Sequence, residues 1–145
     1  MSNYSFKGNA MLEQYREEPQ VMVIDDIPAT RTILKDMLLE MGFKDIVEAK
    51  NGKDALEKLR KHRAQLIICD NMMDGMSGLD LLYQLRNYAY LVDIPFIVVS
   101  SCGDVPVIDT ALDLGAEEYI LKPISFKLFK RKVFDVLRRR VVGAA

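Results

Sequence analysis

The stretch LIICDNMMDGMSG, residues 66–78, places an aspartate directly after a run of four apolar residues. Such a run suits a strand that is buried on both faces, as in a parallel sheet. After Asp70 the chain continues through methionines, glycines and a second aspartate, Asp74, before a helical pattern begins. A carboxylate where a buried strand ends needs charged or polar partners, so we expect other strands to bring such groups to the same place.

The composition of the chain is that of one globular domain. Its 145 residues are 50% apolar and 28% charged, and this is enough to bury a core. With 20 basic and 21 acidic residues the formal net charge is −1, so the basic excess typical of nucleic-acid binding is missing. Cys69 and Cys102 have no metal-ligand or CxxC spacing and are expected to be reduced thiols. Without a membrane-length apolar run or a signal-peptide pattern, we expect a cytoplasmic protein with no membrane insertion.

A strand pattern followed by a helix pattern occurs five times along the chain. The expected strands are residues 21–25, 45–49, 66–70, 95–100 and 118–122, and a helix follows each of them. Glycines such as Gly42 and Gly115 end helices, and Ser125 opens the last one. Because parallel neighbours need helical crossovers, this order predicts an α/β fold, a doubly wound five-stranded parallel sheet with helices on both faces.

The domain boundaries follow from the same patterns. Residues 20–142 contain all five strand and helix patterns and form the predicted domain. Residues 1–19 are polar and mixed, and we interpret them as an N-terminal extension that is flexible or helical. Residues 143–145 are interpreted as a short tail.

The strand ends carry charged and hydroxyl groups. Asp25 and Asp26 close the first strand, Asp70 the third, Ser100 the fourth and Lys122 the fifth. Taken singly, the aspartates suit solvated turns or helix caps, and the serine and the lysine are weak signals. Ligand sites in doubly wound sheets lie outside the carboxyl ends of the strands, so all five residues are expected at one edge. Three carboxylates there would need protons or a hard cation, Mg²⁺ or Mn²⁺, and the lysine could pair with a carboxylate or a phosphoryl group.

Four short motifs resemble those of a known family. They are VIDD (23–26), CDNMMDGMSG (69–78), VVSS (98–101) and YILKP (119–123). Together they resemble the CheY-like receiver domain of two-component response regulators, over residues 20–140. The intervals from Asp26 to Asp70, from Asp70 to Ser100 and from Ser100 to Lys122 are also those usual in that family. The resemblance implies a flavodoxin-like sheet with strand order 2-1-3-4-5.

The resemblance also implies what the acidic residues do. Asp70 would accept a phosphoryl group from the phosphohistidine of a sensor histidine kinase or phosphotransfer protein and become an aspartyl phosphate. Asp25, Asp26 and Asp70 would hold Mg²⁺ together with the backbone carbonyl of Met72. The domain would then catalyse only its own phosphorylation and dephosphorylation, and would not act as an enzyme on other substrates.

The remaining matched residues would bind the phosphoryl group and transmit its presence. Ser100 would donate to one phosphoryl oxygen and Lys122 would neutralise another, with the Lys122–Pro123 peptide bond in the cis form. Tyr119 stands where the family places a switch aromatic, although strand periodicity alone fits a core tyrosine equally well. Phosphorylation would change the surface made by the fourth helix, the fifth strand and the fifth helix, and so control a downstream protein that the sequence does not identify.

The chain departs from the family pattern in the loop after Asp70. Asp74 follows Met73 at a position where a proline is usual. It is either a fourth carboxylate near the metal or a solvent-facing turn residue beside Gly75.

Two side chains near the site are expected to modulate the lifetime of the phosphorylated state. Met72 and Cys102 lie two residues after Asp70 and Ser100, at positions that in relatives flank the path of the attacking water. A thioether and a thiol are weak hydrogen-bonding groups, so slow self-dephosphorylation is expected.

Other classes of function fit the same residues less well. An aspartate-nucleophile phosphatase would carry an acid two residues after the nucleophile, where Met72 stands. A flavin or nucleotide binder would carry a glycine-rich loop after the first strand, where residues 25–31 read DDIPATR. A receiver acting only by protein contact would not need the intact set of site residues. The basic run at 138–140 suits the C-terminal turn of a helix, so no nucleic-acid contact is expected.

Overall fold

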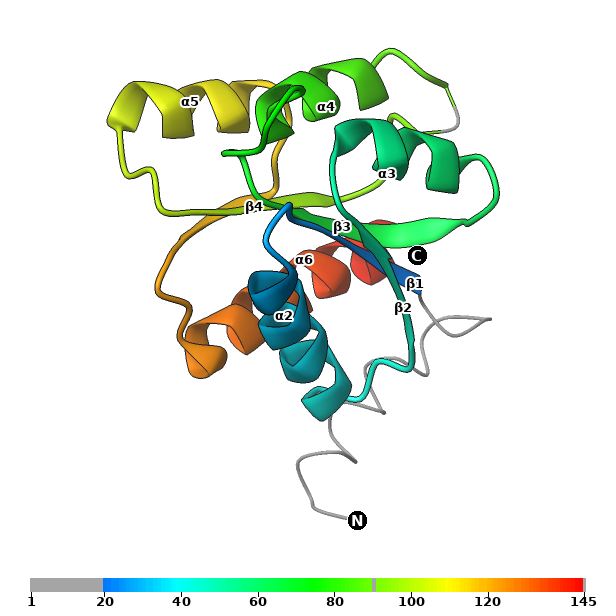
Figure 1. Cartoon of the computed structure of the whole chain (residues 1–145). Helices are drawn as coiled ribbons and strands as arrows, with labels where there is room; N and C mark the ends of the chain where they lie inside the picture. The colour runs from blue at the N-terminus through cyan, green and yellow to red at the C-terminus, as the bar shows by residue number, and fades with distance from the viewer. Residues whose placement is uncertain (1–19, 90, 145) are drawn as a thin grey trace.

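The computed structural model describes residues 20–89 and 91–144, with side chains through residue 139, and this part contains five strands and five helices (Figure 1). The strands are β1 (Gln20–Ile24), β2 (Asp45–Ala49), β3 (Ala64–Cys69), β4 (Phe96–Ser100) and β5 (Glu118–Leu121). The helices are α2 (Pro28–Glu40), α3 (Gly52–Leu59), α4 (Gly78–Leu85), α5 (Val105–Asp113) and α6 (Phe126–Ala144). All paired strands are parallel and their order is β2-β1-β3-β4-β5, which confirms the predicted fold class and strand order.

Each central strand divides its side chains between two apolar layers. In β1, Val21 and Val23 belong to the core that includes residues of α2 and α6. Met22 and Ile24 belong to the core on the other face, with residues of α3, α4 and α5. All four side chains are fully buried, so the strand is an unbroken apolar run in the sequence. Figure 1 shows the two groups of helices on opposite faces of the sheet, which leaves the carboxyl ends of the strands open for a site.

Three of the strands end one residue earlier than the sequence patterns predict. β1 ends at Ile24, so Asp25 is the first residue after it, and β3 ends one residue before Asp70. The N–H of Asp70 still donates to the carbonyl of Ile24 at 2.9 Å, so the backbone keeps its ladder position while the side chain belongs to the loop. β5 likewise ends one residue before Lys122. The charged residues therefore begin the loops and do not end the strands.

Capping signals in the sequence mark the helix ends correctly. At the start of α6, Ser125 Oγ accepts a hydrogen bond from the N–H of Leu128 at 3.3 Å. Gly42 and Gly115 follow α2 and α5 with φ angles of +105° and +102°. This left-handed backbone conformation is open to glycine at little cost, which explains why these two helices end there.

One arginine joins three backbone segments at the edge opposite the strand carboxyl ends. Arg86, directly after α4, donates from Nη1 to the carbonyls of Val92 and Ile94 at 2.9 and 3.1 Å. Its Nη2 donates to the carbonyl of Gly115 at 2.9 Å. The planar fork of donors on a guanidinium suits several acceptors at once. Arg86 thereby ties the end of α4 to the chain that leads into β4 and to the turn between α5 and β5.

The ends of the chain are only partly described. The N-terminal extension expected at residues 1–19 lies outside the described residues. At the other end, α6 continues to Ala144, beyond residue 142 where the sequence suggested the end of the domain. Within the described part of the chain, none of the helices has both the length and the apolar character needed to cross a membrane.

Candidate functional site

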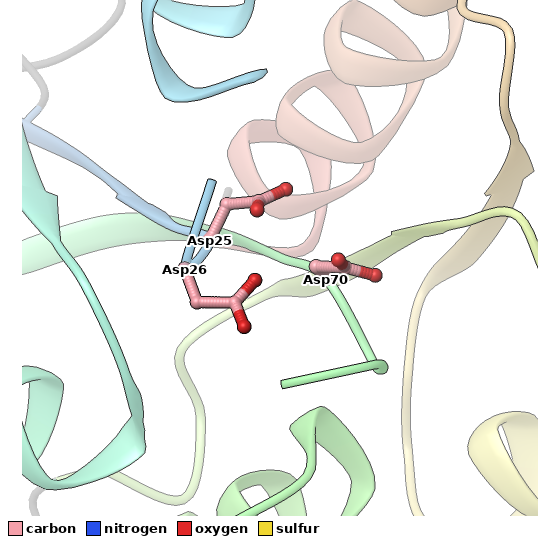
Figure 2. A group of neighbouring side chains, drawn as sticks. All are labelled: Asp25, Asp26 and Asp70. Atoms are coloured by element: carbon pink, nitrogen blue, oxygen red, sulfur yellow. The ribbon is translucent and has the colours of Figure 1, made fainter. Parts of the chain in front are cut away.

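Three carboxylates meet at the carboxyl edge of the sheet. Asp25 and Asp26 follow β1, and Asp70 follows the neighbouring strand β3 (Figure 2). One carboxylate oxygen of each residue lies within 4.8 Å of the other two, close enough to share a metal ion. Asp25 and Asp70 are buried and Asp26 is half-buried. An oxygen-only set of this kind suits a hard divalent cation such as Mg²⁺.

Lys122 supplies the positive charge that the sequence predicts at the same edge of the sheet. Its Nζ lies 3.3 Å from Asp25 Oδ2 and 3.3 Å from Asp70 Oδ2, so the ammonium bridges the two buried carboxylates. The Lys122–Pro123 peptide bond is cis, as the resemblance implied. Three carboxylates against one ammonium leave the ionised site with an excess of negative charge, which favours a further cation.

Burial is the main influence on the ionisation of Asp25. Desolvation raises the pKa of this carboxyl above its ordinary value, and the negative charge of Asp70 raises it further. The N–H of Ile27, which donates to Asp25 Oδ1 at 2.9 Å, and the charge of Lys122 lower the pKa but do not cancel the effect of burial. The charged form of Asp25 is therefore held in an unfavourable environment, which a bound divalent cation would improve.

Arg31 fixes the backbone that carries this acidic pair. From α2 it donates Nη1 to the carbonyl of Asp25 at 2.6 Å, and its Nε lies 3.4 Å from Glu48 Oε1 on β2. The end of β1 is thus tied to the neighbouring strand through one side chain. Arg31 was not predicted as a site residue. The sequence does contain a signal for it, because this arginine lies in the first turns of the helix that follows Asp25 and Asp26.

A second set of contacts joins the ends of β4 and β5. Ser100 is fully buried, and its Oγ accepts a hydrogen bond from the N–H of Cys102 at 3.2 Å. The hydroxyl of Tyr119 donates to the carbonyl of Cys102 at 2.7 Å. Burial raises the pKa of the Tyr119 hydroxyl, which therefore stays protonated as a donor at neutral pH. Cys102 is held at its N–H by Ser100 and at its carbonyl by Tyr119, so a movement of either side chain reaches the other.

Comparison with known proteins decides the family. The sequence profile of the response regulator receiver domain matches residues 21–134. The chain belongs to the response regulator receiver family. It is a CheY-like receiver domain of two-component signalling, with an acidic cluster that could bind a metal.

Receiver domains of several origins resemble this one. Chemotaxis protein CheY1 of Helicobacter pylori is 34% identical over 119 residues, which cover 81% of this chain and 96% of that protein. The probable transcriptional regulator ycf27 of Porphyridium aerugineum is 33% identical over 123 residues, which cover 85% of this chain but only 50% of that protein. A crystal structure of a response regulator receiver protein from Pseudomonas putida is 30% identical, with a TM-score of 0.77, and the match covers 83% of this chain and 99% of that one. The similarity thus extends both to nearly the whole of a shorter protein and to half of a longer regulator.

In this receiver domain the loop after Asp70 packs beside the acidic cluster. The N–H of Met72 donates to Asp70 Oδ1 at 3.2 Å, and this bond orients the carboxylate. The Met72 side chain is 59% exposed, and its Sδ accepts a contact of 3.8 Å from Ser101 Oγ. Asp74 is exposed and, among the described residues, is not one of the carboxylates that meet at the site. Of the two alternatives for Asp74, the structure therefore favours the solvent-facing turn residue.

Proposed function

We propose that this receiver domain is a phosphorylation-switched signalling module in which Asp70 accepts a phosphoryl group. The observation that carries the proposal is the cluster of three aspartates with Lys122 bridging two of them at 3.3 Å. The donor would be the phosphohistidine of a sensor histidine kinase or a phosphotransfer protein. The phosphorus–nitrogen bond breaks as an Asp70 oxygen bonds to phosphorus, and the imidazole leaves with the electron pair and takes a proton from water.

Each residue of the cluster then has a defined task. Asp25, Asp26, Asp70 and the backbone carbonyl of Met72 would hold Mg²⁺ or Mn²⁺, which supplies positive charge to the phosphoryl oxygens. The N–H of Met72 keeps the Asp70 carboxylate oriented through Oδ1. Lys122, which bridges Asp25 and Asp70 at rest, would pair with a phosphoryl oxygen after transfer. The sheet holds these groups in place, so little reorganisation is needed when the donor arrives.

The contacts around Cys102 would convert phosphorylation into a change of surface. Ser100 Oγ would turn from the N–H of Cys102 toward a phosphoryl oxygen. Because Tyr119 is bonded to the carbonyl of the same cysteine, the change would reach its ring and the surface made by α5, β5 and α6. These are the fourth helix, fifth strand and fifth helix of the domain, and a downstream protein would bind there. A phosphoryl mimic such as beryllofluoride should therefore shift NMR signals of α5 and Tyr119, and shifts confined to the loop after Asp70 would contradict this part.

Hydrolysis of other substrates fits the site less well. An aspartate-nucleophile phosphatase needs a general acid near the leaving group, and the residue two positions after Asp70 is Met72, which cannot donate a proton. We infer that the domain catalyses only its own phosphorylation and dephosphorylation.

The test is phosphorylation by acetyl phosphate followed by intact mass. With Mg²⁺ the wild type should gain one phosphoryl group, whereas Asp70→Asn and wild type treated with a chelator should gain none. Asp93→Asn is the matched control, because Asp93 is an exposed aspartate outside the site. Phosphorylation of Asp70→Asn at the wild-type rate would show that another residue is the acceptor. A wild type that gains no phosphoryl group would favour a receiver that acts by protein contact alone.

A further inference from the structure

Asn71, the residue after the proposed phosphoacceptor, completes the first turn of α4. Its backbone carbonyl accepts a hydrogen bond from the N–H of Gly78 at 3.0 Å, and its side-chain Oδ1 accepts one from the N–H of Leu79 at 3.1 Å. The next N–H, that of Asp80, donates to Ser77 Oγ at 3.1 Å. The first N–H groups of a helix have no partner within the helix, so a residue outside it must supply acceptors. Asn71 supplies them for Gly78 and Leu79.

The start of α4 is also pressed against the same stretch of backbone. A Cβ added at Gly78 would lie 2.4 Å from the carbonyl oxygen of Asp70 and 2.9 Å from the Cα of Asn71. Only glycine permits this approach. Residues 72–77 therefore form a loop whose two ends meet at Asn71, where two hydrogen bonds and a close backbone contact fasten them.

The middle of this loop has less constraint. Gly75 has a φ of +77°, a left-handed backbone conformation that glycine adopts at little cost. Asp74 precedes Gly75 at a position where a proline is usual in the family. A proline ring would fix φ there, whereas an aspartate leaves φ free to rotate. Asp74 is exposed, and its side chain makes no hydrogen bond within the described part of the chain. The order of the loop thus depends on its fastened ends, together with the packing of Met73 and Met76 against the core.

We propose that Asn71 is a positioning residue that keeps the loop 72–77 closed and thereby holds the Met72 carbonyl beside Asp70, where the metal ion would bind. The inference rests on the proposed function, since it concerns the same metal site. The side-chain hydrogen bond of Asn71 is the part that substitution can remove, because the backbone carbonyl stays in every variant.

The expected change in Mg²⁺ affinity follows from the fraction of molecules in which the loop is closed. When only a fraction of molecules is competent to bind, the apparent dissociation constant is the intrinsic one divided by that fraction. Loss of one hydrogen bond of ordinary strength shifts the opening equilibrium by about fivefold. The apparent dissociation constant for Mg²⁺ should then rise by up to about fivefold, while saturating Mg²⁺ should restore phosphorylation because the ion itself closes the loop.

The experiment compares Asn71→Ala with the matched control Asn87→Ala. Asn87 lies just after α4, and its Nδ2 donates to the carbonyl of Tyr83 at 3.0 Å, so the control removes an asparagine bond at the other end of the same helix. NMR titration with Mg²⁺ measures metal binding without any need for phosphorylation. Phosphorylation by acetyl phosphate is then timed at limiting and at saturating Mg²⁺. Asn71→Ala should weaken Mg²⁺ binding by up to about fivefold and slow phosphorylation only at limiting Mg²⁺, whereas Asn87→Ala should leave both unchanged.

Asp74→Pro in the Asn71→Ala background separates loop order from other effects of the substitution. A proline at position 74 restricts the loop by fixing φ and does not need the Asn71 hydrogen bond, so Mg²⁺ binding should return to within about twofold of the wild type. Asn71 has no positioning role if Asn71→Ala binds Mg²⁺ like the wild type, if Asn87→Ala weakens binding as much, or if the proline restores nothing. A wild type that binds no Mg²⁺ and accepts no phosphoryl group would instead overturn the proposed function, and with it the role of Asn71.

Discussion

Replacing Asp25 by asparagine should stabilise the metal-free protein and abolish its stabilisation by Mg²⁺. Asp25 is fully buried, accepts the N–H of Ile27 through Oδ1 at 2.9 Å and contacts Lys122 through Oδ2 at 3.3 Å. An asparagine has nearly the same shape and can offer an oxygen to Ile27. It removes one of the three negative charges of the cluster, so the variant tests charge with little change in packing.

The magnitude follows from the distances between the charges. At an effective dielectric constant of about 20, like charges 4.8 Å apart repel by ~3.5 kcal/mol and opposite charges 3.3 Å apart attract by ~5 kcal/mol. Neutralising Asp25 removes its repulsion by Asp26 and Asp70 and its attraction to Lys122, a net relief of about 2 kcal/mol. Water screens the half-buried Asp26 and reduces this relief, whereas the desolvation of a charged Asp25 adds to it. We expect a gain of roughly 1–2 kcal/mol in the free energy of unfolding, or about 4–8 °C in Tm.

The dependence on pH has a definite sign. Because burial raises the pKa of Asp25, the folded protein keeps this proton to a higher pH than the unfolded chain does. The contribution of Asp25 to stability is therefore present in acid and is lost as the pH rises through its folded-state pKa. Asp25→Asn lacks this loss of stability. The difference between its free energy of unfolding and that of the wild type should therefore grow from acid toward neutral pH and then stay constant.

Thermal unfolding with a chelator and with Mg²⁺, over a range of pH, measures each of these effects. The wild type should gain about 2.7 kcal/mol when Mg²⁺ is a hundredfold above its dissociation constant, and Asp25→Asn should gain almost nothing. Asp93→Asn serves as a control for removal of an exposed negative charge. A metal-free Asp25→Asn that is less stable than the wild type would refute the reasoning, because Lys122 would then outweigh the repulsion among the carboxylates.

Three further substitutions test separate features. Gly78→Ala should cost roughly 1–3 kcal/mol in urea unfolding, because its Cβ would meet the Asp70 carbonyl at 2.4 Å, and an unchanged midpoint would contradict that contact. Arg86→Gln should cost about 2 kcal/mol in the same assay, since it leaves carbonyls on two connections without their donor. Met72→Asn should speed phosphate release in single-turnover measurements by up to roughly tenfold, and more together with Cys102→Asn, because polar groups can position the attacking water. An equal or slower release in both variants would show that these side chains do not control that water.

The fold and the acidic cluster could be predicted because simple periodic patterns determine them. Unbroken apolar strands alternating with helices permit few arrangements other than a parallel sheet, and the ends of such strands lie on one edge. Asp25, Asp70 and Lys122 therefore had to come close together, whatever the details of the loops. The shift of each charged residue from the end of a strand to the start of a loop could not be foreseen, since ladder hydrogen bonding continues through the Asp70 backbone.

The residues that hold the loops in place could not be predicted in the same way. Arg31, Asn71 and Arg86 all bind backbone groups that lie six or more residues away along the chain, and such backbone groups have no signature in the sequence. Asn71 also lies beside a more conspicuous aspartate, and nothing in its spacing indicated that it would meet the N–H of Leu79. Such contacts depend on three-dimensional proximity and become visible only when the loops are placed.

The attachment of α5 determines how that helix can move. Its C-terminal end is held where Arg86 Nη2 binds the carbonyl of Gly115 at 2.9 Å. At its other end Asp104 makes no side-chain cap bond within the described residues, and Val105 is 65% exposed. If α5 tilted about Gly115, its two ends would move by different amounts. Over the helix length of about 14 Å, a tilt of about 5° would move the first turn by about 1 Å and the last turn hardly at all. A partner bound across α5 would therefore have its contacts near Val105 rearranged while those near Gly115 persist.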